Sequence, residues 1–189
     1  NDKNEWIDVS FDNNSIMFYN QAYIKKFPQH ISGFISRSRL MPLVNLSHKK
    51  LTKLNRALSA SGVVIKVDSV ALTFKTRPFN TRRHHIHYAK GSTNVDKIDG
   101  KLPIGVDGGL PTVEISAFSL KINNIAIEIP KASFTDIYQP NIKNFNVYSD
   151  NKGNIYLYMP GNSDGAGAYD AVWIVNDCKL VSRDVDSID

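Results

Sequence analysis

Cysteine is almost absent from this chain of 189 residues, since Cys178 is the only one. A single cysteine cannot form an intrachain disulfide, which excludes the small disulfide-stapled scaffolds. This suits the cytosol, and equally a bacterial periplasmic protein whose core needs no cross-link. Cys178 falls in an expected turn, where glycine would be usual, and no neighbouring base could hold a thiolate. We therefore interpret it as an exposed thiol without a catalytic role.

Long hydrophobic runs are also missing. No apolar stretch approaches the roughly 20 residues that a membrane-spanning helix needs, so we expect no transmembrane segment. No signal peptide is recognisable, and the chain begins at Asn1, so we expect a leader or a tag to have been removed. We slightly favour a periplasmic or secreted location over the cytoplasm.

Motifs of established catalytic chemistry are absent as well. Neither Ser133 nor Ser163 lies in the Gly-x-Ser-x-Gly pattern of a nucleophile elbow. Asp107 and Asp136 are turn-type carboxylates, and nothing marks them as the acid pair of a glycosidase. No family resemblance emerges from the remaining residues.

What the sequence does contain is a series of β-hairpins in its last third. Apolar and polar residues alternate over 113–122, with a break of phase at Ala117-Phe118 that indicates a bulge. Asn123-Asn124 then tolerates the positive φ of a two-residue turn before a strand over 125–129. The same pattern recurs over 145–158 and over 169–181. Three consecutive hairpins predict an antiparallel meander.

The first half of the chain is less regular. We expect a hairpin from strands over 5–11 and 16–19, a long strand over 63–76 bent near Ser69, and another strand over 82–90. One amphipathic helix is predicted near residues 47–61, because Ser47 suits an N-cap, apolar residues recur at helical spacing, and Gly62 suits a helix end. The expected fold is mainly β, with α+β kept open: an antiparallel β-sandwich or curved meander sheet packed with this helix.

Charge divides the chain unevenly. Residues 1–90 hold 15 Lys and Arg against 5 Asp and Glu, whereas residues 91–189 hold 8 against 13. We expect a basic N-terminal region over 1–90, a glycine-bearing loop or linker over 91–110, and a hairpin region over 111–189, packed as one domain. A basic surface would attract an anionic partner.

The densest group of functional side chains lies over 82–88. If this stretch is a strand, His85 and His87 share one face and could hold Zn²⁺, for which folding would have to bring a third ligand such as His30 or His48. A solvated basic strand is the plainer interpretation. Arg82 and Arg83 are candidate contacts to an anionic partner, nucleic acid included, although no nucleic-acid motif is present.

Two further features suggest recognition of a macromolecule. The loop over 160–169 is rich in small residues that allow close approach of a partner, and its candidate contacts are Asn162, Ser163, Asp164 and Tyr169. Tyr156 and Tyr158 share a strand face opposite Ile155 and Leu157, so they line the outside if those residues are core. For the loop, the alternative is a plain hairpin connection without a binding role. For the two tyrosines, the alternative is packing under a second layer.

These features favour a non-catalytic macromolecule-binding protein of bacterial type, such as an inhibitor, an immunity protein or an adaptor. It would use an exposed β surface and the glycine-rich loop, with a protein or other macromolecule as its partner and no cofactor. Two alternatives stay open. One is a metal-dependent or other hydrolase that uses the His84–His87 segment, and the other is a nucleic-acid binder that uses the basic N-terminal half.

Overall fold

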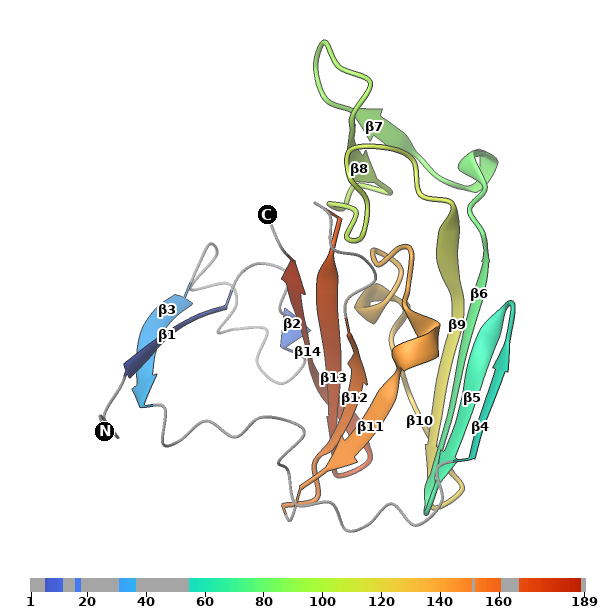
Figure 1. Ribbon diagram of the computed structural model, residues 1–189, viewed down its shortest axis with the longest axis vertical. Coiled ribbons are helices and arrows are strands. Elements are labelled where there is room, and N and C mark those ends of the chain that lie inside the picture. Colours follow the sequence, from blue (N-terminus) through green and yellow to red (C-terminus); the bar gives the residue numbers. More distant parts are fainter. Residues whose placement is uncertain are drawn as a thin grey trace.

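The computed structural model describes residues 6–11, 16–17, 31–36, 55–150, 152–160 and 167–187. Strands dominate this part of the chain (Figure 1), and its only helical segments are three short 3-10 turns. These are η3 (Thr81–Arg83), η4 (Lys131–Ser133) and η5 (Ile142–Asn144). The predicted fold class, a mainly antiparallel β protein, is confirmed.

One five-stranded sheet, which we call the lysine sheet, has the order β10-β9-β6-β5-β4. Its strands are β4 (Asn55–Ser59), β5 (Gly62–Val67), β6 (Val70–Pro78), β9 (Val113–Ile122) and β10 (Ile125–Ile127). All pairs are antiparallel. The predicted break of phase in β9 is present as a bulge, because Lys75 pairs with Ala117 and Thr76 with Ile115, which leaves Ser116 without an opposite residue.

The second five-stranded sheet, which we call the tyrosine sheet, has the order β11-β12-β13-β14-β2. Its strands are β2 (Ile16–Met17), β11 (Asn146–Ser149), β12 (Ile155–Met159), β13 (Tyr169–Asn176) and β14 (Lys179–Ser187). The three hairpins predicted from the last third of the sequence are all confirmed, as β9/β10, β11/β12 and β13/β14.

The two large sheets stack face to face (Figure 1) and enclose one hydrophobic core to which both contribute. Aromatic rings form its centre. Trp173 of β13 packs edge-on against Phe118 of β9, with ring centroids 5.1 Å apart, and stacks on Phe145 at 6.1 Å. Phe74 of β6 contacts all three rings. In β6 and β13, buried inward positions alternate with half-buried or exposed outward ones, as a sandwich requires.

Two small sheets complete the described fold. β7 (Ile86–Tyr88) pairs with β8 (Val95–Ile98) above the end of the lysine sheet. β1 (Trp6–Phe11) pairs with β3 (Ile31–Ser36), whereas β2 joins β14. The predicted hairpin between residues 5–11 and 16–19 is therefore wrong, because each strand pairs with a distant partner. The predicted linker over 91–110 contains β8, and the division of the chain there stays a prediction.

The amphipathic helix predicted near residues 47–61 is wrong over the part that the structure describes. Asn55–Ser59 is strand β4, and Gly62, the expected helix end, begins strand β5. Residues 47–54 lie outside the described residues. Pairing with β5 prevails over helical spacing, since Ala57 lies opposite Val64 and Leu58 opposite Val63. Similarly, the long bent strand over 63–76 is the hairpin β5/β6.

Candidate functional site

The outer surface of the lysine sheet carries three lysines in a triangle. Inward positions of β5, β6 and β9 are buried in the core, so Lys66, Lys75 and Lys121 project outward and are exposed. Lys66 and Lys121 flank Ala71 across paired strands, which places their Cα atoms roughly 10 Å apart. Lys75 lies four residues along β6 from Ala71, or roughly 13 Å away. We call this surface the lysine face.

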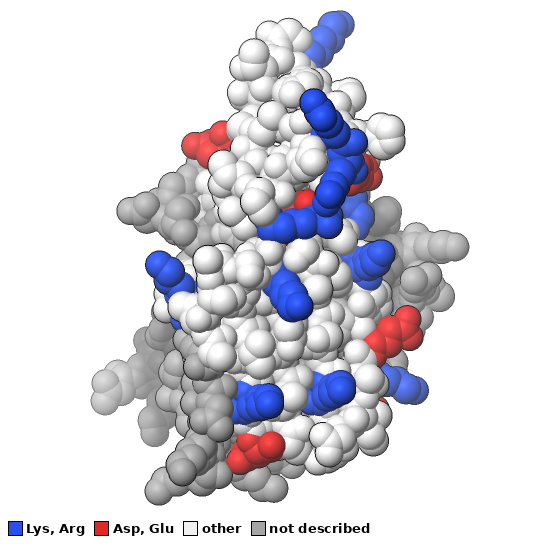
Figure 2. Space-filling model, turned by 90° about the vertical axis from the view of Figure 1, so that its right-hand side faces the viewer, with Lys and Arg blue, Asp and Glu red and all other residues white. Residues whose placement is uncertain are grey.

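Between the lysines the surface is neutral and its side chains are small. The cross-strand row Val64–Thr73–Ser119 runs through the middle of the triangle, and Ala71 and Ala117 occupy the rows on either side. Figure 2 shows this side of the molecule, with blue side chains scattered over white and red ones near the margins. Within the described residues, no ion pair engages the three lysines. Their charges are therefore available to an anionic partner.

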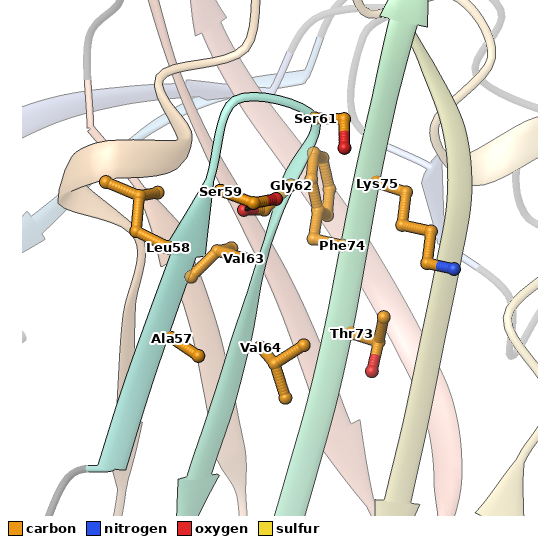
Figure 3. Close-up of a pocket in the computed structure, with 10 residues that line it drawn as sticks. All are labelled: Ala57, Leu58, Ser59, Ser61, Gly62, Val63, Val64, Thr73, Phe74 and Lys75. Carbon is orange, nitrogen blue, oxygen red and sulfur yellow. Dashed lines mark hydrogen bonds between the residues drawn. The ribbon is translucent and has the colours of Figure 1, made fainter.

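A hollow of about 170 Å³ adjoins the triangle where β4 turns into β5 (Figure 3). Gly62 lines it and has to be glycine, because a Cβ there would collide with the carbonyl oxygen of Phe74. Leu58 stands at its side with 49% of its surface exposed. Lys75 points away from the ring of Phe74, its neighbour on β6. The hollow is thus a mainly apolar recess beside a cation.

A chain of charged side chains crosses the end of the lysine sheet near β7. His84 contacts two carboxylates, Asp99 Oδ2 through Nδ1 at 2.7 Å and Glu114 Oε2 through Nε2 at 2.8 Å. Glu114 Oε1 accepts a hydrogen bond from Arg77 Nε at 2.5 Å. The His84 ring also stacks on Phe79, with centroids 4.6 Å apart. Carboxylates contact both ring nitrogens of His84, so this residue links the side chains at the end of the sheet. It has no ring nitrogen available to take a proton from a nucleophile.

This charge chain changes the ionisation of its neighbours. Partial burial alone would raise the pKa of Asp99, but hydrogen bonds from His84 and the His85 N–H, with the charges of both imidazoles, lower it below its usual value. Burial, together with Asp99, Glu114 and Asp136, raises the pKa of Tyr138 well above its usual value. The corner therefore favours the anionic form of Asp99 and the neutral phenol of Tyr138.

The two histidines proposed as metal ligands lie just before and within β7. His85 precedes β7, and its backbone N–H donates to Asp99, whereas His87 lies in β7 with Nδ1 3.0 Å from Asp96 Oδ2. The strand predicted over 82–90 is confined to Ile86–Tyr88, and metal binding by His85 and His87 stays a prediction. In the part of the chain that the structure describes, no three His, Cys, Asp or Glu side chains are grouped to hold a metal ion.

The predicted tyrosine surface is present in part. Tyr156 and Tyr158 lie opposite the buried Leu157, as expected, but both are only half-exposed. Their hydroxyls donate to Asp150 and Asp170, at 3.0 and 2.9 Å respectively. Burial, followed by the bond to Asp170 and its charge and by Tyr148, raises the pKa of Tyr158 to about 12. These hydroxyls are already engaged.

The prediction that Tyr169 is a contact to a partner is wrong. Tyr169 is 2% exposed and belongs to the core, where its hydroxyl donates to the carbonyl of Tyr138 at 2.9 Å. It faces inward because β13 alternates strictly between buried and half-buried positions. Its side chain therefore cannot contact a partner on the surface. The other proposed loop contacts, Asn162, Ser163 and Asp164, lie outside the described residues.

Arg82 and Arg83 lie in η3, just beyond the end of β6, and both are exposed as a binding role requires. Sequence reasoning missed the lysine face, although Lys66, Lys75 and Lys121 each follow the outward phase of an alternating strand. The sequence includes His84 in the candidate His84–His87 segment but does not reveal its contacts, because Asp99 and Glu114 are distant in the chain. Within the described residues, no helix has the length and apolarity needed to cross a membrane.

Comparisons with other proteins add no assignment. No protein-family model matches the sequence, and no curated protein or solved structure matches it significantly.

Proposed function

We propose that the protein is a non-catalytic binding protein whose lysine face engages an acidic protein surface. One observation carries the proposal: Lys66, Lys75 and Lys121 surround a neutral patch on one exposed sheet face, without ion pairs in the described part of the chain. A neutral centre with a charged rim is the usual anatomy of a protein interface. The apolar hollow at Gly62 would accept a partner side chain next to Lys75.

An acidic protein fits this face better than a nucleic acid does. The residues between the lysines are small, and none is aromatic, so the face has no platform on which bases could stack. The lysines also form a triangle, whereas a nucleic-acid backbone calls for cations that follow its path. Charge around a patch that can be desolvated suits carboxylates on a folded partner.

The hydrolase alternative has less support from the geometry. Both ring nitrogens of His84 contact carboxylates, His87 contacts Asp96, and His85 is exposed before β7. A general base needs a free nitrogen within reach of the proton that it takes. His84 lacks such a nitrogen, whereas His87 keeps Nε2, but the side chain of His87 is 68% exposed and lines neither the hollow at Gly62 nor the depression at the end of β6.

The test measures binding of fluorescein-labelled poly-L-glutamate, by anisotropy, to the full chain and to a variant with Lys66→Gln, Lys75→Gln and Lys121→Gln. Three rim contacts of about 0.5 kcal/mol each predict a loss of about tenfold in affinity. The control carries Lys90→Gln, Lys97→Gln and Lys179→Gln, which are exposed positions elsewhere and lower the net charge equally. We expect the control to stay within about twofold of the parent, because its lysines lie outside the contact.

Equal losses in the two triple variants would contradict the proposal, because they would show that net charge alone drives binding. A mixed-sequence DNA duplex is titrated in parallel. If the duplex binds more tightly than poly-L-glutamate and depends on the same three lysines, the nucleic-acid alternative replaces the acidic-protein partner. Failure of poly-L-glutamate to bind the parent chain would also refute the proposal.

A further inference from the structure

An open depression of about 570 Å³ lies where β6 ends, beyond the lysine face. Its walls come from the end of β6, from η3 and from the segment that leads into β9. The lining residues are Arg77, Pro78, Phe79, Asn80, Thr81, Arg83, Leu110 and Pro111. The volume falls in the range of roughly 300–1,000 Å³ that is usual for small-molecule sites.

The charged residues that line this depression, Arg77 and Arg83, are both cations, and none of the acidic side chains that the structure describes lines it. Asn80 Oδ1 already accepts a hydrogen bond from the Arg82 backbone N–H at 3.1 Å, so Asn80 offers its amide NH₂ as a donor. Thr81 adds a hydroxyl. The polar part of the wall is therefore rich in donors, which suits an oxyanion.

The guanidinium of Arg77 is held in place before any ligand arrives. Its Nε donates to Glu114, which contacts His84, and the His84 ring stacks on Phe79 in the wall of the depression. In the part of the chain that the structure describes, the two terminal nitrogens of Arg77 make no hydrogen bond. A donor pair that is already ordered loses less entropy when it binds.

The rest of the lining is apolar. Phe79, Pro78 and Pro111 line the depression, together with Leu110, which leaves 42% of its surface exposed. An exposed leucine beside two arginines gives the site both an anionic end and an apolar end, as a small organic anion would require.

We propose that this depression binds a small organic phosphate monoester, with the phosphate between Arg77 and Arg83 and the organic group against Phe79 and Leu110. A phosphate monoester carries a charge close to −2 at neutral pH and three acceptor oxygens, so it can accept hydrogen bonds from Arg77 and Arg83 together. Guanidinium also pairs with phosphate through two parallel hydrogen bonds. The proposal does not depend on a protein partner at the lysine face.

The experiment titrates the full, isotopically labelled chain with phenyl phosphate and follows amide shifts by NMR. We expect saturable shifts confined to residues around the depression. Arg83→Gln should weaken binding by about tenfold or more, the usual effect of losing one charge-assisted hydrogen bond. Arg82→Gln is the matched control, because Arg82 is an exposed neighbour in η3 that does not line the depression. It should change affinity by less than about threefold.

Three further ligands separate the parts of the proposal. Benzoate lacks the second charge, phenol lacks the anion, and inorganic phosphate lacks the apolar group, so each should bind more weakly than phenyl phosphate. If inorganic phosphate binds as tightly, the organic-ester assignment is wrong. If phenyl phosphate does not saturate, or if Arg82→Gln and Arg83→Gln weaken it equally, the site itself is refuted.

Discussion

The ion pair between Arg183 and Asp136 should be one of the most sensitive points of the fold. Arg183, in β14, is 1% exposed, and Asp136, in the turn after η4, is 8% exposed. Nη1 donates to Oδ1 at 2.6 Å and Nη2 to Oδ2 at 3.1 Å, so the contact is bidentate. The ion pair joins β14 of the tyrosine sheet to the segment that follows η4.

Removing one partner should cost far more than removing both. Asp136→Ala removes the carboxylate that contacts both terminal nitrogens of a buried guanidinium, and breaking a buried pair on one side costs about 3–5 kcal/mol. The double variant Asp136→Leu with Arg183→Met replaces the pair with apolar groups, which is often neutral or stabilising. We therefore expect the single variant to be much less stable than the double variant.

Urea unfolding, followed by tryptophan fluorescence, measures this difference, because Trp173 is fully buried. With a slope of about 2 kcal/mol/M, a loss of about 4 kcal/mol moves the midpoint by about 2 M. The exposed Asp107→Ala serves as a control and should shift it by less than about 0.3 M. A midpoint for Asp136→Ala within about 0.5 M of the parent would refute the view that Asp136 compensates a buried charge.

Two further predictions concern single positions. Cys178 adopts φ +57° in the turn between β13 and β14, so Cys178→Gly should raise stability by about 1 kcal/mol in the same urea assay, with no gain expected from Cys178→Ala. The pKa of Asp99 is lower in the folded protein than its usual value of 3.8. Ionised Asp99 therefore stabilises the fold above pH 3.8, and this stabilisation disappears as the pH falls through the pKa of the folded state. The parent should therefore exceed Asp99→Asn in thermal midpoint at pH 7 and lose that advantage below pH 3.8; a gap that persists in acid would contradict this.

The hairpins could be predicted because their turns are local. Asn123 and Asn124 have φ of 51° and 65°, the left-handed conformation that a two-residue turn requires and that asparagine tolerates. By contrast, the turn between β5 and β6 uses Asp68-Ser69, with neither glycine nor proline, inside an apolar run. The pattern of residues 63–76 therefore predicts one bent strand instead of a hairpin.

Elements that depend on distant partners could not be predicted in the same way. Ala57 and Leu58 suit a helix by spacing, and only pairing with β5 makes them a strand. The lysine face also depends on pairing between strands that are distant in the sequence. The outward phase of Lys66, Lys75 and Lys121 is local, but their grouping depends on the register that sets Lys66 and Lys121 on either side of Ala71.

The uneven charge of the sequence becomes a difference between the two outer faces of the sandwich. β5 and β6, from the basic half, place Lys66 and Lys75 outward on the lysine sheet. On the tyrosine sheet, β13 and β14 come from the acidic half. Asp170 of β13 pairs with Asp186 of β14, and Asp184 of β14 pairs with Val172 of β13. Cations grouped on one face orient an approaching acidic partner toward that face before contact. The association rate in the poly-L-glutamate assay should therefore fall as salt is added, because screening removes this long-range orientation.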